Sequence, residues 1–204
     1  MQGQLAGQPI RIYGDLASCN CQKVKFTADY LKIPYQWVHV DLRGGDTHTQ
    51  HFLRLNPEGQ VPVVELPGGE ALCDANTIIL FLGEGTPLLP KNRFILARVH
   101  EMMDWERNSH EPYVAVCRGM MVYDRRPMYE RETWRVQRSE KALDHMEALL
   151  ARSKWMAGDA MTLADICLLP CTRLAHEGGF SLERRPRVQQ WVARCERMLG
   201  LPPA

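Results

Sequence analysis

Three short segments in the first half of the chain carry residues whose types and order suit chemistry on a small ligand. Ser18-Cys19-Asn20-Cys21 opens one predicted helix, Gln60-Val61-Pro62 opens a predicted strand, and Asp74-Ala75 opens a second helix. Together they offer a hydroxyl, an amide, two thiols and an acid, and the helix N-termini add positive potential. This combination predicts a site for a small anionic thiol peptide.

The elements that must position these segments follow from hydrophobic periodicity and turn residues. The predicted elements are a strand over 9–13, a helix over 20–31, a strand over 35–41, a short helical segment at 49–55, a strand over 61–66, a turn at 67–70, a strand at 71–73 and a helix from 74 to 82. The first three form a βαβ unit, so we expect their strands to be parallel. The order is β-α-β followed by β-β-α.

The second half of the chain reads as helical throughout. A linker at 84–91, rich in proline and glycine, divides a first domain at 8–83 from a second at 92–201. The predicted helices cover 93–110, 113–124, 129–152, 162–176 and 186–199. Thr162 and Asp165 have the spacing of a capping box, so Asp165 is expected to be a folding element and not a catalytic acid.

Composition argues against several classes of partner. The formal net charge is +1, and acidic residues are interleaved with the arginines, so we expect neither a nucleic-acid nor a membrane partner. Residues 1–8 lack an apolar run and read as a frayed tail. Seven cysteines without a disulfide-like spacing favour the reducing cytoplasm, and no second Cys or His pair supports a metal site.

Several motifs in their order and spacing resemble the cytosolic glutathione transferases, over nearly the whole chain. The motifs are Tyr13-Gly14, Ser18 to Val24, Asn56 to Val63, Asp74 to Ile78, Trp155 to Asp159 and Thr162 to Ile166. Two further segments, Ser109 to Tyr113 and Ala175 to Phe180, look like a bacterial branch with serine-type or theta-like sites. The resemblance implies a fold of class α/β plus all-α: an N-terminal thioredoxin-like domain, then an all-helical domain, as a homodimer.

The resemblance also implies a detoxification reaction, in which glutathione is the co-substrate and its thiolate attacks a small apolar electrophile. Ser18 is the preferred hydrogen-bond donor to the sulfur, although a plain helix cap is the alternative, and Asn20 is the second candidate. Cys19 is either a tolerated small residue or a redox-active thiol, whereas Cys21 is interpreted as a buried structural thiol. The C-x-C spacing does not favour dithiol exchange.

The same resemblance assigns the residues that bind the peptide. Pro62 is expected to be a cis-proline that lets the Val61 backbone pair with the cysteinyl backbone of glutathione. Asp74 meets the α-amino group, and the N–H of Ala75 meets the γ-glutamyl carboxylate without the hydroxyl usual in the family. One such lost bond would weaken binding by about 1.5–3 kcal/mol. His48 and Gln60 are expected at the glycyl end.

The electrophile pocket is expected in the first helices of the second domain, from Trp105, His110 and Tyr113, with a break at Pro112 leaving the last two side chains free. Three functions stay open at this point. They are a glutathione transferase that uses Ser18, a glutathione-dependent disulfide or hydroperoxide reductase, and a non-catalytic binding module that keeps the fold.

Overall fold

The computed structural model describes residues 8–204, and the chain divides into two compact units, Met1–Pro87 and Leu88–Ala204. The division falls inside the segment 84–91 that composition marks as a linker. Of the tail predicted at residues 1–8, only Gln8 lies among the described residues.

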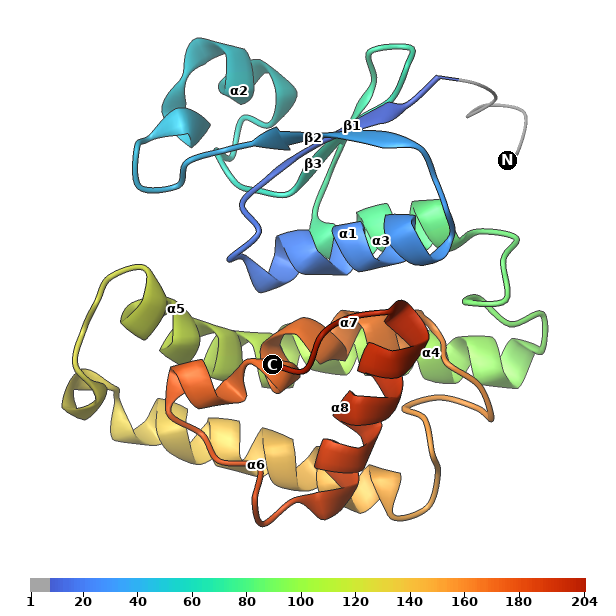
Figure 1. Ribbon diagram of the computed structural model, residues 1–204, viewed down its shortest axis with the longest axis vertical. Coiled ribbons are helices and arrows are strands. Elements are labelled where there is room, and N and C mark those ends of the chain that lie inside the picture. The colour runs from blue at the N-terminus through green and yellow to red at the C-terminus, as the bar shows by residue number, and fades with distance from the viewer. Residues whose placement is uncertain (1–7) are drawn as a thin grey trace. The chain divides into compact units, whose positions relative to one another are not determined.

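A four-stranded mixed sheet forms the centre of the first unit, in the order β2-β1-β3-β4. The strands are β1 (Ile10–Gly14), β2 (Tyr35–His39), β3 (Val63–Glu65) and β4 (Ala71–Cys73). β1 pairs with β2 in parallel, whereas β3 runs antiparallel to both β1 and β4 (Figure 1). The predicted parallel βαβ unit and the hairpin that follows it are therefore confirmed.

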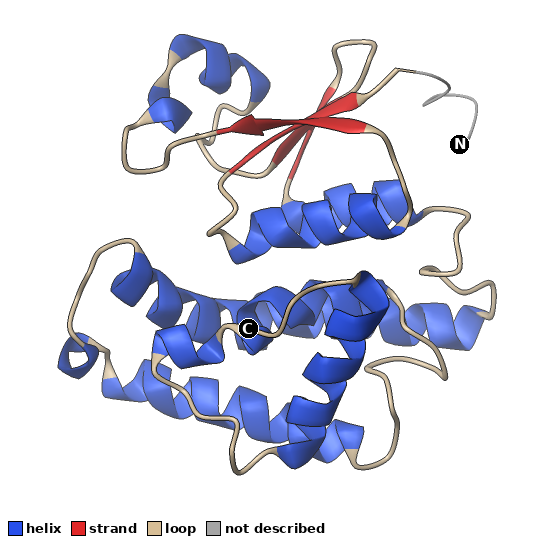
Figure 2. Cartoon of the chain, in the orientation of Figure 1, coloured by secondary structure: helices blue, strands red, loops and turns tan. Residues whose placement is uncertain are grey.

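Helices cover the sheet on two sides. α1 (Cys19–Tyr30) and α3 (Ala75–Gly83) lie next to each other on one face, and α2 (Gln50–Leu55) lies beyond the other (Figure 2). A 3-10 turn, η1 (Asp46–His48), occupies the loop before α2. This is the thioredoxin-like arrangement that the family resemblance implies.

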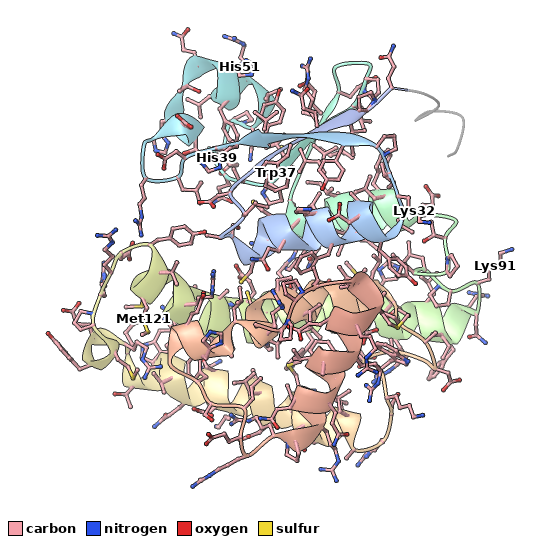
Figure 3. All side chains as sticks on the ribbon, viewed as in Figure 1. Lys32, Trp37, His39, His51, Lys91 and Met121 are labelled. Atoms are coloured by element: carbon pink, nitrogen blue, oxygen red, sulfur yellow. The ribbon has the colours of Figure 1, made fainter. Side chains whose placement is uncertain are left out.

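Close approach between β1 and α1 depends on Gly14. A Cβ at Gly14 would lie 2.8 Å from the sulfur of Cys21 and 3.2 Å from the ring of Trp37. Figure 3 shows Trp37 between the sheet and α1, in line with this contact. Any larger residue at position 14 would therefore push the start of α1 away from the strand that precedes it.

The second unit is helical. Its elements are α4 (Arg93–Trp105), the π-helical segment η2 (Glu106–Ala115), α5 (Val116–Val122), η3 (Met128–Glu130), α6 (Thr133–Leu150), α7 (Leu163–Arg173), η4 (Ala175–Gly178) and α8 (Pro186–Leu199). α7 is buried along its whole length except at its last residue. Across residues 8–204, no helix combines the length and apolar character needed to cross a membrane.

The predicted helix break near Pro112 is wrong, because the chain stays helical from α4 through η2 into α5. Proline lacks an N–H and its ring crowds the preceding turn, and a wider turn accommodates both features. Arg135 supports this turn by donating from Nη1 to the Pro112 carbonyl at 2.6 Å.

Asp165 is fully buried and organises the start of α7. Its carboxylate accepts hydrogen bonds from Thr162 N (2.9 Å) and Thr162 Oγ1 (3.1 Å). It also accepts from Met156 N (2.9 Å) and Trp191 Nε1 (2.8 Å). Burial raises the pKa of Asp165, and the four hydrogen bonds oppose that rise. The predicted capping box is confirmed, and the carboxylate joins α7 to α8 as well.

Candidate functional site

Strand register brings the three candidate segments to one end of the sheet. Tyr13 near the end of β1 pairs with Val63 at the start of β3, and Val63 pairs with Cys73 at the end of β4. The chain therefore leaves β1, enters β3 and leaves β4 at the same end of the sheet. Ser18, Val61 and Asp74 all lie within five residues of these paired positions. The predicted constellation thus has a common place in the first unit.

Ser18 is the N-cap of α1, with extended backbone and its Oγ accepting from Cys21 N at 3.4 Å. Asp15 holds the loop in front of it, because its carbonyl accepts from Ser18 N at 3.0 Å and its carboxylate accepts from Ala17 N at 2.8 Å. A hydroxyl that accepts from a backbone N–H keeps its own hydrogen for another acceptor. Ser18 can therefore cap the helix and donate to a ligand together.

The two thiols of the first helical turn differ in what they can do. Cys21 is fully buried, and this burial raises the pKa of its thiol to about 11. The interpretation of Cys21 as a structural thiol agrees with this burial. Cys19 is the first residue of α1 and is also buried, although 7% of its surface remains exposed. Asn20 follows it and is half-buried.

The segment before β3 has the expected cis-proline, since the Val61–Pro62 peptide bond is cis. Buried Asn56 shapes the loop by donating from Nδ2 to the Gln60 carbonyl at 2.8 Å. His48 lies beside this loop: a Cβ at Gly59 would lie 3.9 Å from His48 Cε1. His48 and Gln60 are both exposed, so the structure brings the two residues predicted for the glycyl end into one neighbourhood.

Asp74 caps α3 from an unusual backbone conformation. Its φ is 71°, in the region that favours glycine, and its Oδ1 accepts from Thr77 N at 2.8 Å. Non-glycine residues with positive φ carry strain that is concentrated at functional sites. Ala75 follows as the first helical residue and is buried. The structure therefore places an acid and a helix N-terminus together, as predicted.

Lys23 lies inside the Ser18–Val24 motif, and the structure gives it a role in holding the site together. It is 2% exposed, and its Nζ donates to Asn76 Oδ1 at 3.1 Å. This bond joins α1 to α3 immediately behind their N-terminal residues. It also holds the oxygen of the Asn76 amide toward α1. The sequence signal that could have identified Lys23 is a lysine on the same buried helix face as Val24 and Thr27.

The aromatic candidates in the second unit all contact neighbouring helices of the bundle. His110 is fully buried, with Nε2 3.1 Å from Thr172 Oγ1, so the prediction that its side chain is free is wrong. The Trp105 ring contacts the His145 ring of α6 in a tilted arrangement, with 4.9 Å between the ring centroids. The Tyr113 hydroxyl accepts a hydrogen bond from Nη1 of Arg138, which also lies on α6, at 3.0 Å. The continuous helix through Pro112 removes the break that would have released these side chains.

A hollow in the first unit lies on the α2 side of the sheet, away from the candidate segments. It has a volume of about 360 Å³ and is lined in part by Tyr13, His39 and His51. Figure 3 marks the two histidines. The Tyr13 hydroxyl donates to Glu65 at 2.7 Å and its ring packs on Phe52, so Tyr13 belongs to this side. Within residues 8–204, no three His, Cys, Asp or Glu side chains gather as metal ligands do.

The comparisons with known proteins agree with this geometry. The model described as glutathione S-transferase, N-terminal domain, matches residues 17–84, and the one described as glutathione S-transferase, C-terminal domain, matches residues 122–198. A crystal structure of a glutathione S-transferase from Pseudomonas fluorescens is 40% identical in sequence, with a TM-score of 0.88. That match covers 93% of this chain and 95% of the other.

Two curated proteins extend the likeness beyond one genus. Glutathione S-transferase 3 of Zea mays is 30% identical over 200 residues, covering 90% of this chain and 87% of that protein. Glutathione S-transferase GstB of Escherichia coli is 29% identical over 197 residues, covering 89% and 90%. With both domain models matched, and with the sheet register, the cis-proline and the two helix caps in place, the chain belongs to the glutathione S-transferase family.

Proposed function

We propose that the chain conjugates glutathione to apolar electrophiles and that Ser18 donates a hydrogen bond to the glutathione thiolate. The carrying observation is the position of Ser18 at the N-cap of α1, where its hydroxyl accepts from Cys21 N and retains a hydrogen to donate. The positive end of the α1 dipole adds to the stabilisation of the thiolate.

The energetic requirement is within reach of these two contributions. Lowering a thiol pKa from about 8.5 by two units takes roughly 3 kcal/mol of preference for the thiolate. A hydrogen bond to a charged group contributes about 1.5–3 kcal/mol. A helix N-terminus contributes about 0.3–1 kcal/mol. Ser18 and α1 together can therefore make the bound thiol ionise near neutral pH.

Beyond ionising the thiol, the protein then needs only to hold the electrophile next to the sulfur. The thiol proton passes to solvent, and the sulfur lone pair forms a C–S bond to the electrophilic carbon. In a substitution the leaving group departs with its electron pair. We assign the electrophile to the helical unit, with the half-buried Trp105 and Tyr113 as candidates; His110 is excluded because it is fully buried.

The remaining residues of the first unit are assigned to glutathione itself. The Val61 backbone beside cis Pro62 pairs with the cysteinyl backbone, and Gln60 and His48 serve the glycyl end. Asp74 receives the α-amino group, and the Ala75 N–H at the start of α3 receives the γ-glutamyl carboxylate. The shared end of the sheet supports this assignment, because one extended tripeptide can reach all of these positions.

The test compares Ser18→Ala with Thr49→Ala. Thr49 is a matched control because it caps α2 in the same way, its Oγ1 accepting from Phe52 N at 3.3 Å. We expect both variants to lose about 1 kcal/mol of stability. Only Ser18→Ala should raise the pKa of bound glutathione, read from thiolate absorbance, and slow conjugation of a chloronitrobenzene. An unchanged pKa and rate in Ser18→Ala would refute the role of Ser18.

A second candidate function, reduction of disulfides or hydroperoxides with glutathione, is favoured by one observation. Cys19 is the first residue of α1, where the helix N-terminus favours a thiolate. Loss of reductase activity in Cys19→Ala, with activity kept in Ser18→Ala, would establish it over conjugation. If calorimetry shows no saturable binding at millimolar glutathione, neither reaction holds and the chain is a binding module.

We also infer a serine-type, theta-like site, a cytoplasmic setting and a homodimer. The homodimer is supported by apolar side chains on the helical unit, where Tyr129 is 85% exposed, Met128 51% and Trp134 48%. Exposed aromatic groups of this size are concentrated at protein interfaces. Light scattering coupled to gel filtration should give twice the chain mass, and Trp134→Glu should lower it. A monomeric mass for the unmodified protein would refute the homodimer.

A further inference from the structure

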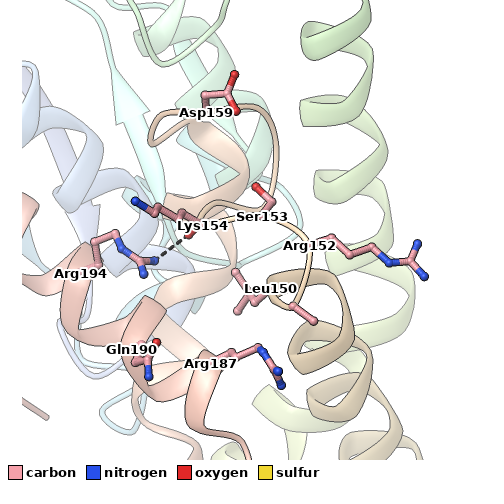
Figure 4. Close-up of a pocket in the computed structure, with 9 residues that line it drawn as sticks. Leu150, Arg152, Ser153, Lys154, Asp159, Arg187, Gln190 and Arg194 are labelled. Atoms are coloured by element: carbon pink, nitrogen blue, oxygen red, sulfur yellow. Dashed lines mark hydrogen bonds between the residues drawn. The ribbon is translucent and has the colours of Figure 1, made fainter.

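A cleft in the helical unit, far from the candidate residues along the chain, has the character of a separate binding site. It has a volume of about 680 Å³ and lies among the end of α6, the loop at 151–160 and α8 (Figure 4). Sites for small molecules usually have volumes of about 300–1,000 Å³. The cleft therefore has room for a complete ligand and not only for an ion.

The lining of the cleft is strongly cationic. Arg152, Lys154, Arg187 and Arg194 line it, against one carboxylate, Asp159. The whole chain has 25 Lys and Arg and 24 Asp and Glu. A local ratio of four cations to one anion thus departs sharply from the balance of the chain. Clefts lined by one sign of charge concentrate ligands of the opposite sign.

The structure holds two of these cations in place. Arg194 donates from Nη1 to the Lys154 carbonyl at 2.7 Å, and its guanidinium lies over the Trp155 ring at 5.3 Å. Figure 4 shows this bond between Arg194 and Lys154. Glu147 binds Arg187 Nη1 at 3.0 Å. A guanidinium that is already oriented loses less entropy when it binds an anion.

Carboxylates of the protein neutralise only part of the positive charge of the cleft. Glu147 offsets the charge of Arg187. In the described part of the chain, no carboxylate forms an ion pair with Lys154 or with Arg194. Figure 4 shows the Arg152 side chain extending away from the other three cations. Lys154, Arg187 and Arg194 are therefore the groups available to an anion, and of these three only Arg187 is ion-paired within residues 8–204.

Gln190 and Asp159 indicate what accompanies the anionic part of the ligand. Gln190 on α8 is exposed and offers an amide with donors and an acceptor. Asp159 can accept hydrogen bonds from hydroxyl groups. We propose that the cleft binds a small soluble molecule that carries a phosphate and hydroxyl groups. Two arginines suit the phosphate, because the guanidinium fork matches its oxygens.

The experiment uses inorganic pyrophosphate as the probe and calorimetry on the full chain. The double variant Lys154→Gln/Arg194→Gln removes the two cations for which no ion pair forms within the described residues. Lys141→Gln/Arg184→Gln removes the same net charge from exposed positions that do not line the cleft. We expect one saturable site, weakened at least about tenfold in the first variant and less than about twofold in the control. Equal weakening in both variants, or no saturable binding to the unmodified chain, would overturn the proposal.

A gain-of-binding variant keeps the test valid if the double variant unfolds. Asp159→Asn removes the only carboxylate of the lining and should tighten pyrophosphate binding by about two- to tenfold. Unchanged or weaker binding would contradict the proposal. Vesicles of phosphatidylcholine with phosphatidic acid distinguish a lipid headgroup from a soluble ligand. Sedimentation with these vesicles without binding of pyrophosphate would also overturn it. Pyrophosphate binding should survive in Ser18→Ala, so this site is tested independently of conjugation.

Discussion

Replacing Asp74 with asparagine separates the helix cap that its carboxylate forms from the charge that we propose it offers to the ligand. Asparagine tolerates the φ of 71° and keeps an Oδ1 that can accept from Thr77 N. Asparagine and aspartate are equivalent N-caps. Stability should therefore fall only by the lost charge at the helix N-terminus, about 0.3–1 kcal/mol.

Glutathione affinity should fall much further. If Asp74 receives the α-amino group, its charge contributes about 1.5–3 kcal/mol, so the dissociation constant should rise about 10- to 150-fold. Calorimetry with glutathione and with its analogue lacking the α-amino group completes a double-mutant cycle. The analogue should bind both proteins equally.

Two results would refute this reasoning. One is an unchanged dissociation constant for glutathione, which would remove Asp74 from the ligand. The other is equal weakening of the analogue, which would mean that Asp74 acts only through α3. Asp74→Ala is the control for the cap, because alanine removes the acceptor of Thr77 N and is strained at positive φ. It should lose about 2–3 kcal/mol of stability.

Three further predictions concern single side chains. Ala75→Ser should tighten glutathione binding about tenfold by adding a hydroxyl at the start of α3; calorimetry with unchanged affinity would show that the site does not lack it. Cys21 should resist iodoacetamide at pH 8 in the native chain, because burial raises its pKa to about 11, and mass spectrometry should find it labelled only in denaturant. Since that folded pKa lies above the unfolded value, the stability due to Cys21 is complete below about pH 8.5 and is lost as the pH rises through about 11. Asp165→Ala should lose more than about 3 kcal/mol in urea unfolding, because three buried N–H donors lose their acceptor. The exposed Asp104→Ala is its control, and an equal loss in both would contradict this account.

The elements of the first unit could be predicted from the sequence because their signals are local. Alternating Ile10 and Ile12, the turn at 67–70 and the cap at Asp74 each specify structure over a few residues. Boundaries moved by one or two residues, as at β1 and α3. The cap at Ser18 was predicted in the same way, whereas the sulfur contact that we assign to it still depends on experiment.

The second unit shows where local reasoning failed. Pro112 reads as a helix break, but a π-helical turn absorbs it and Arg135 binds its carbonyl from another helix. The burial of His110 follows from that turn and from Thr172, which is 62 residues away in the chain. A proline predicts a local disturbance, and only the packing around it decides whether the helix breaks or widens.

The sequence by itself determined the order of elements, the helix caps, the cis-proline position and the family, because these depend on residue types at short spacing. Tertiary structure alone decided that Tyr13, Val63 and Cys73 share one end of the sheet, which gathers the site. It also decided that Lys23 joins α1 to α3, and that Arg194 binds the Lys154 carbonyl at the cleft. Apart from the hairpin pair Val63–Cys73, these contacts join residues 40 or more positions apart. No local pattern specifies them, because they form only when the whole core packs.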